Sequence, residues 1–191
     1  MADATSPPEA KLICGMIAAD EAHFARAADR LAPHFGDVEL ASEIMDFDFT
    51  RYYEPQMGPQ LRRRFLAFAG LFAPDRLADA KLATNALEAD LAAALAAERP
   101  SGPPRPINLD PGYVEPGKLV LASMKNFAHR VYLGRGVYAE VTLLYRGGRW
   151  TPLEWTFPDY ASGRYDAFLS AARERLLAQR RAAPAETEGR A

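Results

Sequence analysis

The alternation of apolar and polar residues predicts helices mixed with strands in the first half of the chain. An apolar run over residues 11–19 is typical of a buried strand, and Asp20 can cap the helix that follows. Period-two alternation over 38–49 predicts a second strand, and the apolar run 65–72 predicts a third. The Ala- and Leu-rich stretch 74–99 predicts the longest helix.

Beyond Ser101-Gly102-Pro103-Pro104 the pattern changes to a series of short strands. Strands are expected over 118–124, 129–133, 137–145 and 150–157, with tight turns at 134–136 and 146–148. A last amphipathic helix is expected over 162–180. The chain therefore predicts an α+β fold, a mostly antiparallel sheet of seven to eight strands with about three helices packed on one face.

The length of 191 residues suits one domain with a substantial core. We expect this single α+β domain over residues 11–181, between disordered tails at 1–10 and 182–191, which are polar and rich in Pro, Ala and Glu. The formal net charge of -2 disfavours nucleic-acid binding except through a local basic patch, such as Arg62–Arg64 for RNA.

The sequence also excludes several classes of protein and site. The single cysteine, Cys14, cannot form an internal disulfide, and one cysteine with three histidines is too few for a structural zinc site. The phosphate-binding loop of the common NTPases and the Gly-x-Ser-x-Gly elbow of hydrolases are both absent. No secretory signal and no apolar run of about 18 residues is present, so a cytoplasmic protein without membrane contact is expected.

Side chains that can transfer protons or bind anions are concentrated between Asn108 and Thr142. His129 is the natural proton carrier near neutral pH, and Lys125 can bind an anionic oxygen. Alternation over 137–143 places Glu140 on the side away from the apolar face, either in solvent or in a polar site. Across the predicted turn at 134–136, Arg130 and Tyr132 could be cross-strand neighbours of Tyr138 and Glu140. Asp110 either caps an Asp-Pro-Gly turn or acts as a general base. We therefore expect catalytic roles for Glu140, His129, Asp110 and Lys125.

Other polar and aromatic side chains are expected to bind the ligand. Lys81, Asn85 and Glu88 share a face of the long helix, which is either solvated or turned toward the site. Asp48, Asp110 and Glu140 carry oxygen ligands that Mg²⁺ prefers and would hold such an ion jointly. The expected ligand-binding residues are Asp48, Thr50, Tyr52, Lys81, Asn85, Asn108, Tyr113, Ser123 and Arg130.

The chain also resembles a known family at specific motifs. These include Phe47-Asp48-Phe49-Thr50, Asn108-Leu109-Asp110-Pro111-Gly112-Tyr113, His129-Arg130 and Tyr138-Ala139-Glu140-Val141-Thr142. They are similar to a bacterial and archaeal family described as domain of unknown function 4416, and the resemblance runs from residue 11 to about 180. Some members carry an automatic GTP-binding label, which implies nucleotide binding. The family offers no catalytic residues to carry over.

Three functions follow as expectations. The first is an enzyme acting on a phosphorylated or nucleotide-like small molecule, with or without Mg²⁺. The second is a non-catalytic module that binds a GTP-like nucleotide or RNA, and the third is a structural protein that binds a partner. The first two require charged side chains that are distant in sequence to meet in one hollow; these are Asp48, Asp110, Lys125, His129 and Glu140.

Overall fold

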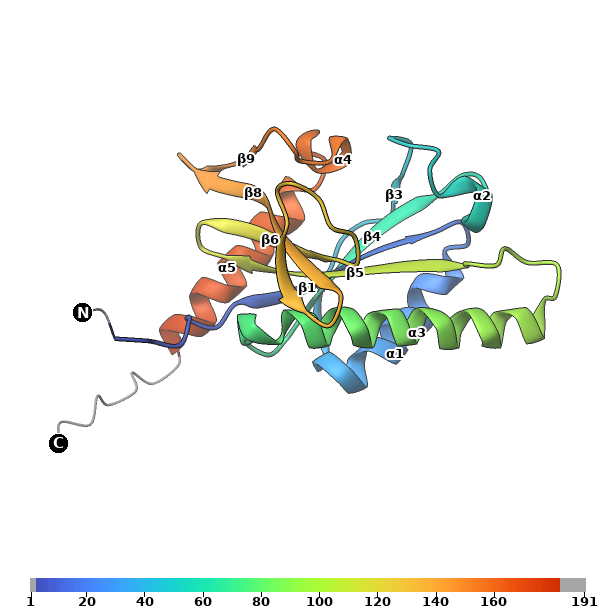
Figure 1. Cartoon of the computed structure of the whole chain (residues 1–191), viewed down its shortest axis with the longest axis horizontal. Coiled ribbons are helices and arrows are strands. Elements are labelled where there is room, and N and C mark those ends of the chain that lie inside the picture. Colours follow the sequence, from blue (N-terminus) through green and yellow to red (C-terminus); the bar gives the residue numbers. More distant parts are fainter. Residues whose placement is uncertain (1–2, 183–191) are drawn as a thin grey trace.

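The computed structural model describes residues 3–182 and shows a nine-stranded sheet flanked by helices (Figure 1). The strands are β1 Lys11–Ala18, β2 Val38–Ala41, β3 Met45–Asp46, β4 Arg62–Phe68, β5 Ile107–Glu115, β6 Lys118–Ser123, β7 Val131–Gly134, β8 Val137–Arg146 and β9 Arg149–Pro152. The helices are α1 Ala22–Phe35, α2 Glu54–Met57, α3 Leu77–Glu98, α4 Pro158–Ala161 and α5 Asp166–Ala182, with a short 3₁₀ turn, η1 Pro74–Arg76, before α3.

The sheet has the strand order β2-β4-β1-β5-β6-β8-β7, with β3 paired to β4 and β9 paired to β8. Each described pair is antiparallel. Short turns join β5 to β6, β7 to β8 and β8 to β9, as expected for the second half of the chain. The seven residues 124–130 connect β6 to β7, and β8 lies between these two strands in the sheet. The predicted α+β class and the mostly antiparallel sheet are confirmed.

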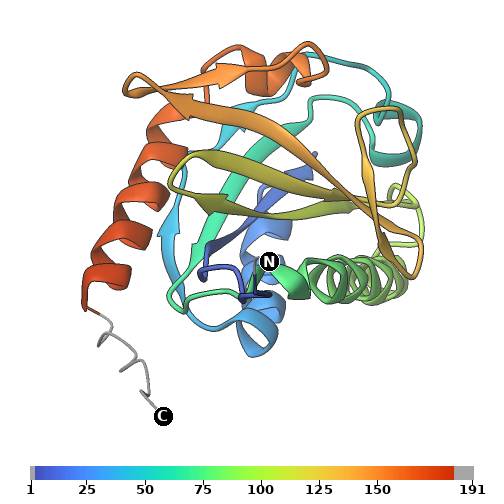
Figure 2. The same ribbon diagram turned by 60° about the vertical axis from the view of Figure 1, so that its left-hand side comes forward.

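Helices cover both faces of this sheet, so the expectation of helices on one face is wrong in that detail (Figure 2). Successive residues of β1 point to opposite faces. Leu12 and Cys14 pack in a core with α1 and α3, whereas Ile13 packs in a second core with α5. The central strands are therefore apolar on both sides, and the run 11–19 lacks the alternation that a one-sided sheet would show.

Several strand boundaries differ from those expected. The predicted strand 38–49 is split into β2 and β3, which both pair with β4. The last strand ends at Pro152, and Pro158 instead begins the short helix α4. The Asp110-Pro111-Gly112 sequence lies inside β5 rather than in a turn, because β1 pairs with it along its length. Strand pairing over a long sequence separation here outweighs the local preference for a turn.

The expected N-terminal tail carries no helix or strand over residues 3–9, and Ala10 forms an isolated bridge with Phe72. Almost all of the expected C-terminal tail, residues 183–191, lies outside the described residues. Within residues 3–182, no helix is both long and apolar enough to cross a bilayer.

Candidate functional site

The sheet opens between β5 and β6, and this opening creates the candidate site. Pairing between the two strands runs from Glu115 with Lys118 to Gly112 with Leu121. Strand β6 then continues along β8 as far as Ser123, which pairs with Tyr138. Among the described residues, positions 107–111 of β5 pair with β1 alone. One side of their backbone is therefore left without a strand partner.

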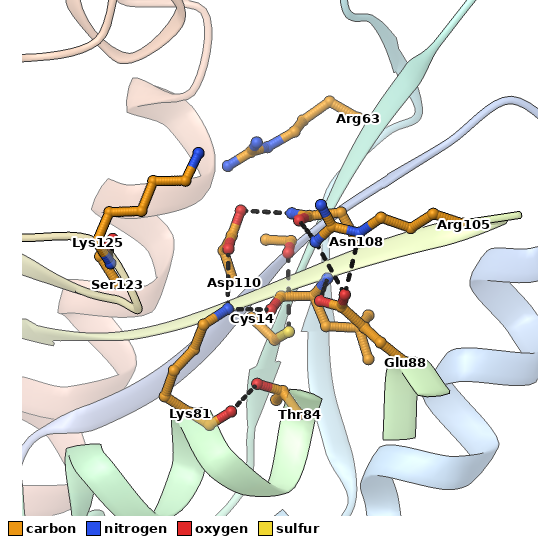
Figure 3. Close-up of polar contacts among 12 residues, drawn as sticks. Cys14, Arg63, Lys81, Thr84, Glu88, Arg105, Asn108, Asp110, Ser123 and Lys125 are labelled. Atoms are coloured by element: carbon orange, nitrogen blue, oxygen red, sulfur yellow. Dashed lines mark hydrogen bonds and ion pairs between the residues drawn. The ribbon is translucent and has the colours of Figure 1, made fainter. Parts of the chain in front are cut away.

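Two side chains of α3 take the place of the missing strand (Figure 3). Lys81 Nζ donates to the Leu109 carbonyl at 2.9 Å, and Glu88 Oε1 accepts from the Leu109 N–H at 2.6 Å. Lys81 and Glu88 are seven positions apart in the sequence, about two helical turns, and so share a face of α3. Both backbone groups of Leu109 are thereby satisfied by charged side chains.

The same opening explains the proline inside a central strand. In an antiparallel ladder, backbone groups of alternate residues point to the same side. The nitrogen of Pro111 therefore points the same way as that of Leu109, away from β1 and toward the opening. Proline has no N–H to donate, and no neighbouring strand on this side needs one.

A chain of hydrogen bonds leads from this point across the face of β5. Lys81 Nζ lies 3.2 Å from Asp110 Oδ1, and Asn108 Nδ2 donates to Asp110 Oδ2 at 2.5 Å. Arg105 donates to the Asn108 side-chain oxygen and to Glu88 Oε2, the latter at 2.9 Å. We call these five residues the β5 cluster; they are Lys81, Glu88, Arg105, Asn108 and Asp110. Within the cluster Lys81 pairs with Asp110, and Arg105 pairs with Glu88.

The two carboxyl groups of the β5 cluster have opposite pKa shifts. Burial raises the pKa of Glu88 above its ordinary value and outweighs the neighbouring Lys81 and Arg105. For Asp110, burial acts in the same direction, but Lys81, Arg63 and the Asn108 amide together hold its pKa below the ordinary value. Asp110 is therefore the carboxylate that the surrounding cations stabilise most clearly.

Arg63 of β4 lies beside this cluster and is almost completely buried, at 3% exposure. Its guanidinium is packed among the rings of Phe65, Tyr160 and Tyr165, at 4.8, 5.2 and 5.7 Å from the ring centroids. It donates to the Tyr160 hydroxyl at 2.6 Å, and Asp159 Oδ2 is 3.9 Å away, too far for a hydrogen bond. Within residues 3–182, Arg63 Nε has no hydrogen-bond partner.

A glycine makes room for this guanidinium. A Cβ atom on Gly15 would lie 2.8 Å from Arg63 Nη2 and 2.9 Å from Phe65 Cε1, both too close. Gly15 pairs with Phe65 on one side and with Asp110 on the other. The bare backbone of Gly15 thus lets Arg63 lie flat on β1, next to Asp110.

Two tyrosines and a lysine lie over the cluster. Lys125 Nζ donates to the Tyr52 hydroxyl at 2.7 Å and lies 4.5 Å from the centroid of that ring. The neighbouring Tyr53 is half-buried, and burial together with Asp110 raises its pKa to about 12. Tyr52 is exposed, and its hydrogen bond from Lys125 lowers its pKa. Figure 3 shows the charged ends of Lys125 and Arg63 turned toward one another.

A second polar network is centred on Glu140. Its Oε2 accepts from His129 Nε2 at 2.9 Å and from Arg130 Nε at 2.8 Å. Arg130 also donates to Ser123 Oγ at 2.8 Å and to the Lys125 carbonyl at 2.9 Å. The network therefore fixes the position of the segment that carries Lys125.

Glu140 is only 3% exposed, so of its two expected surroundings, solvent and a polar site, the structure shows polar contacts with His129 and Arg130. The face of β8 that carries Glu140 is covered, as the apolar face is. The segment 124–130 folds back over this face. Arg130 lies opposite Glu140 across the hairpin, one position beyond the pair Val131 and Ala139. This cross-strand approach of Arg130 to Glu140 was expected from the tight turn at 134–136.

The structure divides the predicted site residues into those that meet and those that do not. Lys81, Asn108 and Asp110 belong to the β5 cluster; Ser123, Lys125, His129, Arg130 and Glu140 belong to the network beside it, and Tyr52 joins it through Lys125. Asp48, Thr50, Tyr113 and Asn85 do not take part in these contacts.

These four residues have other surroundings. Asp48 and Thr50 line an open depression of about 550 Å³ beside β3, and Asp48 pairs there with Arg164 at 3.1 Å. Tyr113 packs on the opposite face of the sheet, 6.3 Å from the ring centroid of Phe72. Asn85 is half-buried on α3.

The carboxylates proposed for Mg²⁺ do not fit a shared ion. Each of the three pairs with a different cation: Asp48 with Arg164, Asp110 with Lys81 and Glu140 with Arg130. In the described part of the chain, no three acidic, histidine or cysteine side chains are grouped so as to hold a metal.

The expected basic patch Arg62–Arg64 also does not form. Strand alternation sends its members in different directions. Arg63 is buried, Arg62 pairs with Asp46 at 3.1 Å, and Arg64 donates to the Ser42 carbonyl at 3.3 Å. A continuous basic surface for RNA phosphates is therefore not present at this strand.

Sequence reasoning missed Gly15 and Arg105 as contacts of the β5 cluster, and it considered Arg63 only as part of a basic patch. Glu88 was expected on the same helix face as Lys81, and it accepts from the Leu109 N–H. The seven-residue spacing of Lys81 and Glu88 was a usable signal, since it places both on one helix face. Three consecutive arginines in a strand were another, because a strand in a covered sheet must turn one of them inward.

The fold and site define an α+β protein whose opened antiparallel sheet holds a buried, polar, cation-rich cluster. The chain belongs to the family described as domain of unknown function (DUF4416), whose model matches residues 8–176. No curated protein and no solved structure matches the chain.

Proposed function

We propose that the protein binds a small phosphorylated molecule at the β5 cluster, with Arg63 and Lys125 as the groups that bind phosphate. The observation that carries the proposal is the buried Arg63 guanidinium, whose Nε has no partner among the described residues. A buried donor without a partner costs about 1–3 kcal/mol, and more when the group is charged. An anionic ligand oxygen would remove that cost.

The charge balance supports the same conclusion. Lys81 is paired with Asp110, and Arg105 with Glu88. Lys125 contacts only the hydroxyl and ring of Tyr52 among its described side-chain partners. Arg63 lies 3.9 Å from Asp159 without a hydrogen bond to it. Among the described contacts, Arg63 and Lys125 are therefore the cations of the site that donate to no carboxylate, and both prefer phosphate oxygens as acceptors.

The aromatic rings beside these cations fit the rest of such a ligand. Tyr52 is exposed, and its ring lies 5.1 Å from that of Tyr53. Faces of exposed tyrosines are suited to stacking on a nucleobase. A nucleotide is thus one ligand class consistent with the site, and a sugar phosphate is the smaller alternative that uses the cations alone.

A thermal-shift panel tests the proposal with inorganic phosphate, GTP and glucose 6-phosphate, against sodium chloride at equal ionic strength. Saturation at about 100 times Kd stabilises a protein by about 2.7 kcal/mol, which corresponds to roughly 5–11 °C for a chain of this size. We expect Lys125→Ala to abolish the shift. Lys118→Ala is the matched control, because Lys118 pairs with Glu115 in the β5–β6 hairpin and lies outside the cluster.

The proposal fails if none of the three compounds shifts the melting temperature beyond the salt control. It also fails if Lys125→Ala and Lys118→Ala reduce a shift equally, since that result would indicate a general effect of positive charge.

A specific geometry favours acid–base chemistry on the bound molecule as a second function. Glu140 is an acceptor, so the 2.9 Å contact places the proton of a neutral His129 on Nε2 and leaves Nδ1 as the basic nitrogen. The His129 ring is held parallel to Trp155, at 5.3 Å and 8°. If a panel compound is turned over, ³¹P spectra should show the reaction lost in His129→Gln while the thermal shift persists.

A further inference from the structure

Exposed apolar side chains gather at one edge of the sheet, next to the Glu140 network. The described residues include eight large hydrophobic side chains that are exposed, and seven of them lie in or beside β7. Their exposed fractions are Met124 42%, Phe127 64%, Val131 69%, Tyr132 59%, Leu133 43%, Trp155 39% and Phe157 45%. We call these seven residues the β7 edge.

The members of the β7 edge are linked through neighbouring rings. Phe127 lies 5.1 Å from His129, which in turn lies 5.3 Å from Trp155. The guanidinium of Arg130 lies 5.9 Å from the ring of Phe157. These contacts bring Phe127, Trp155 and Phe157 together around His129 and Arg130, directly before β7 in the chain.

Strand β7 is an exposed edge of the sheet. It is the last strand of the sheet order and pairs only with β8 among the described strands. Lysine, proline or a bulge often prevents an edge strand from pairing with another chain. Strand β7 carries no lysine or proline, and its register against β8 shifts only after Tyr132, between Tyr132 and Gly134. Residues 131–134 read Val-Tyr-Leu-Gly, and both faces of the strand are exposed at Val131 and Tyr132.

The area of the β7 edge is large for a surface left in water. A fully exposed aromatic side chain offers about 200 Å², so the four aromatic members at about half exposure offer roughly 400 Å². Met124, Val131 and Leu133 bring the total to roughly 650 Å², above the largest patch of about 300–600 Å² on a typical monomer. A stable interface needs about 800 Å² from each partner. The β7 edge and its backbone together approach this size.

The charges at this edge favour a second copy of the chain as the partner. Arg130 is paired with Glu140, and Arg135 with Asp79. Lys125 is turned away to the Tyr52 hydroxyl. Strand β7 itself carries no charged side chain, so two copies can meet along it without like-charge repulsion.

We propose that the protein forms a two-fold symmetric dimer in which β7 pairs antiparallel with β7 of a second copy. Two identical strands that pair antiparallel are related by a two-fold axis, because each contact of residue i with residue j of the second copy is repeated as a contact of j with i. With the axis at Tyr132, Val131 faces Leu133 of the second copy, and both side chains are apolar. The exposed rings of Phe127, Trp155 and Phe157 then flank the joined strands.

Sedimentation velocity of the full chain tests the dimer. We expect a species of twice the 21.0 kDa chain mass, whose fraction grows with concentration. Val131→Lys places a charge next to the axis and should weaken the dimer at least about tenfold, leaving the 21.0 kDa species. Ala89→Lys is the matched control, an equal charge change at an exposed position of α3, and should remain dimeric.

A single 21.0 kDa species from micromolar to near-millimolar concentration would overturn the proposal. A dimer that persists in both Val131→Lys and Leu133→Lys would overturn it as well, because the interface would then lie elsewhere. If the lysine variants do not fold, amide exchange of the wild type decides. Protection of residues 131–133 must rise with protein concentration, and unchanged protection contradicts the dimer.

Discussion

Replacing Lys81 with methionine removes the ammonium that closes the opening between β5 and β6. Methionine matches the length and apolar stem of lysine, so packing against α3 is largely kept. The Leu109 carbonyl then loses its donor, and Asp110 loses its closest cation. An unsatisfied buried acceptor costs about 1–3 kcal/mol, and breaking a buried ion pair about 3–5 kcal/mol.

The two costs overlap, and the Asp110 side chain is 27% exposed and keeps Asn108 as a partner, so the lower part of the range applies. We expect Lys81→Met to lower the free energy of unfolding by about 3 kcal/mol, or roughly 6–12 °C in melting temperature. Lys118→Met is the control and should cost less than about 1 kcal/mol, because its ion pair with Glu115 is partly exposed.

Urea unfolding followed by tryptophan fluorescence measures these differences. The double variant Lys81→Met/Asp110→Asn should recover about 1–3 kcal/mol relative to the sum of the single variants, since the two side chains contact each other directly. A Lys81→Met variant as stable as the Lys118→Met control would refute the buried ion pair. Strict additivity in the double variant would refute the coupling to Asp110.

Two further predictions concern the same face of the sheet. The lowered pKa of Asp110 adds stability that is present above the unfolded value of about 4 and is lost as pH falls through the folded value. The melting temperatures of wild type and Asp110→Asn should therefore differ at pH 7 and converge toward pH 3; a constant difference would contradict the shift. Gly15→Ala should cost about 1–3 kcal/mol in urea unfolding and weaken phosphate binding, because its Cβ meets Arg63 and Phe65; unchanged stability and binding would show that this close approach is absent.

Local patterns in the sequence predicted the elements that depend on neighbouring residues. The helical spacing of 74–99 corresponds to α3 with its preceding 3₁₀ turn, and the glycine-containing turns at 134–136 and 146–148 correspond to the hairpins of β7, β8 and β9. The α+β class followed from these elements. The position of Arg130 opposite Glu140 followed from the length of the first turn.

Features set by distant pairings could not be read in the same way. The Asp-Pro-Gly sequence favours a turn, and only its pairing with β1 and the adjacent opening make a strand acceptable there. Alternation separates the two faces of β8, but it does not tell which of them other segments cover, so the choice between solvent and a polar site for Glu140 stayed open. The burial of Arg63 depends on Gly15, which lies 48 positions earlier in the chain.

The most direct test of the central claim is titration calorimetry of GTP and of inorganic phosphate into the wild type, Lys125→Ala and Lys118→Ala at fixed ionic strength. A site completed by Arg63 and Lys125 predicts saturable binding of at least one of them with one site per chain, weakened about tenfold or more in Lys125→Ala and unchanged in Lys118→Ala. Absence of saturable heat for both compounds, or equal affinity in all three proteins, would contradict it.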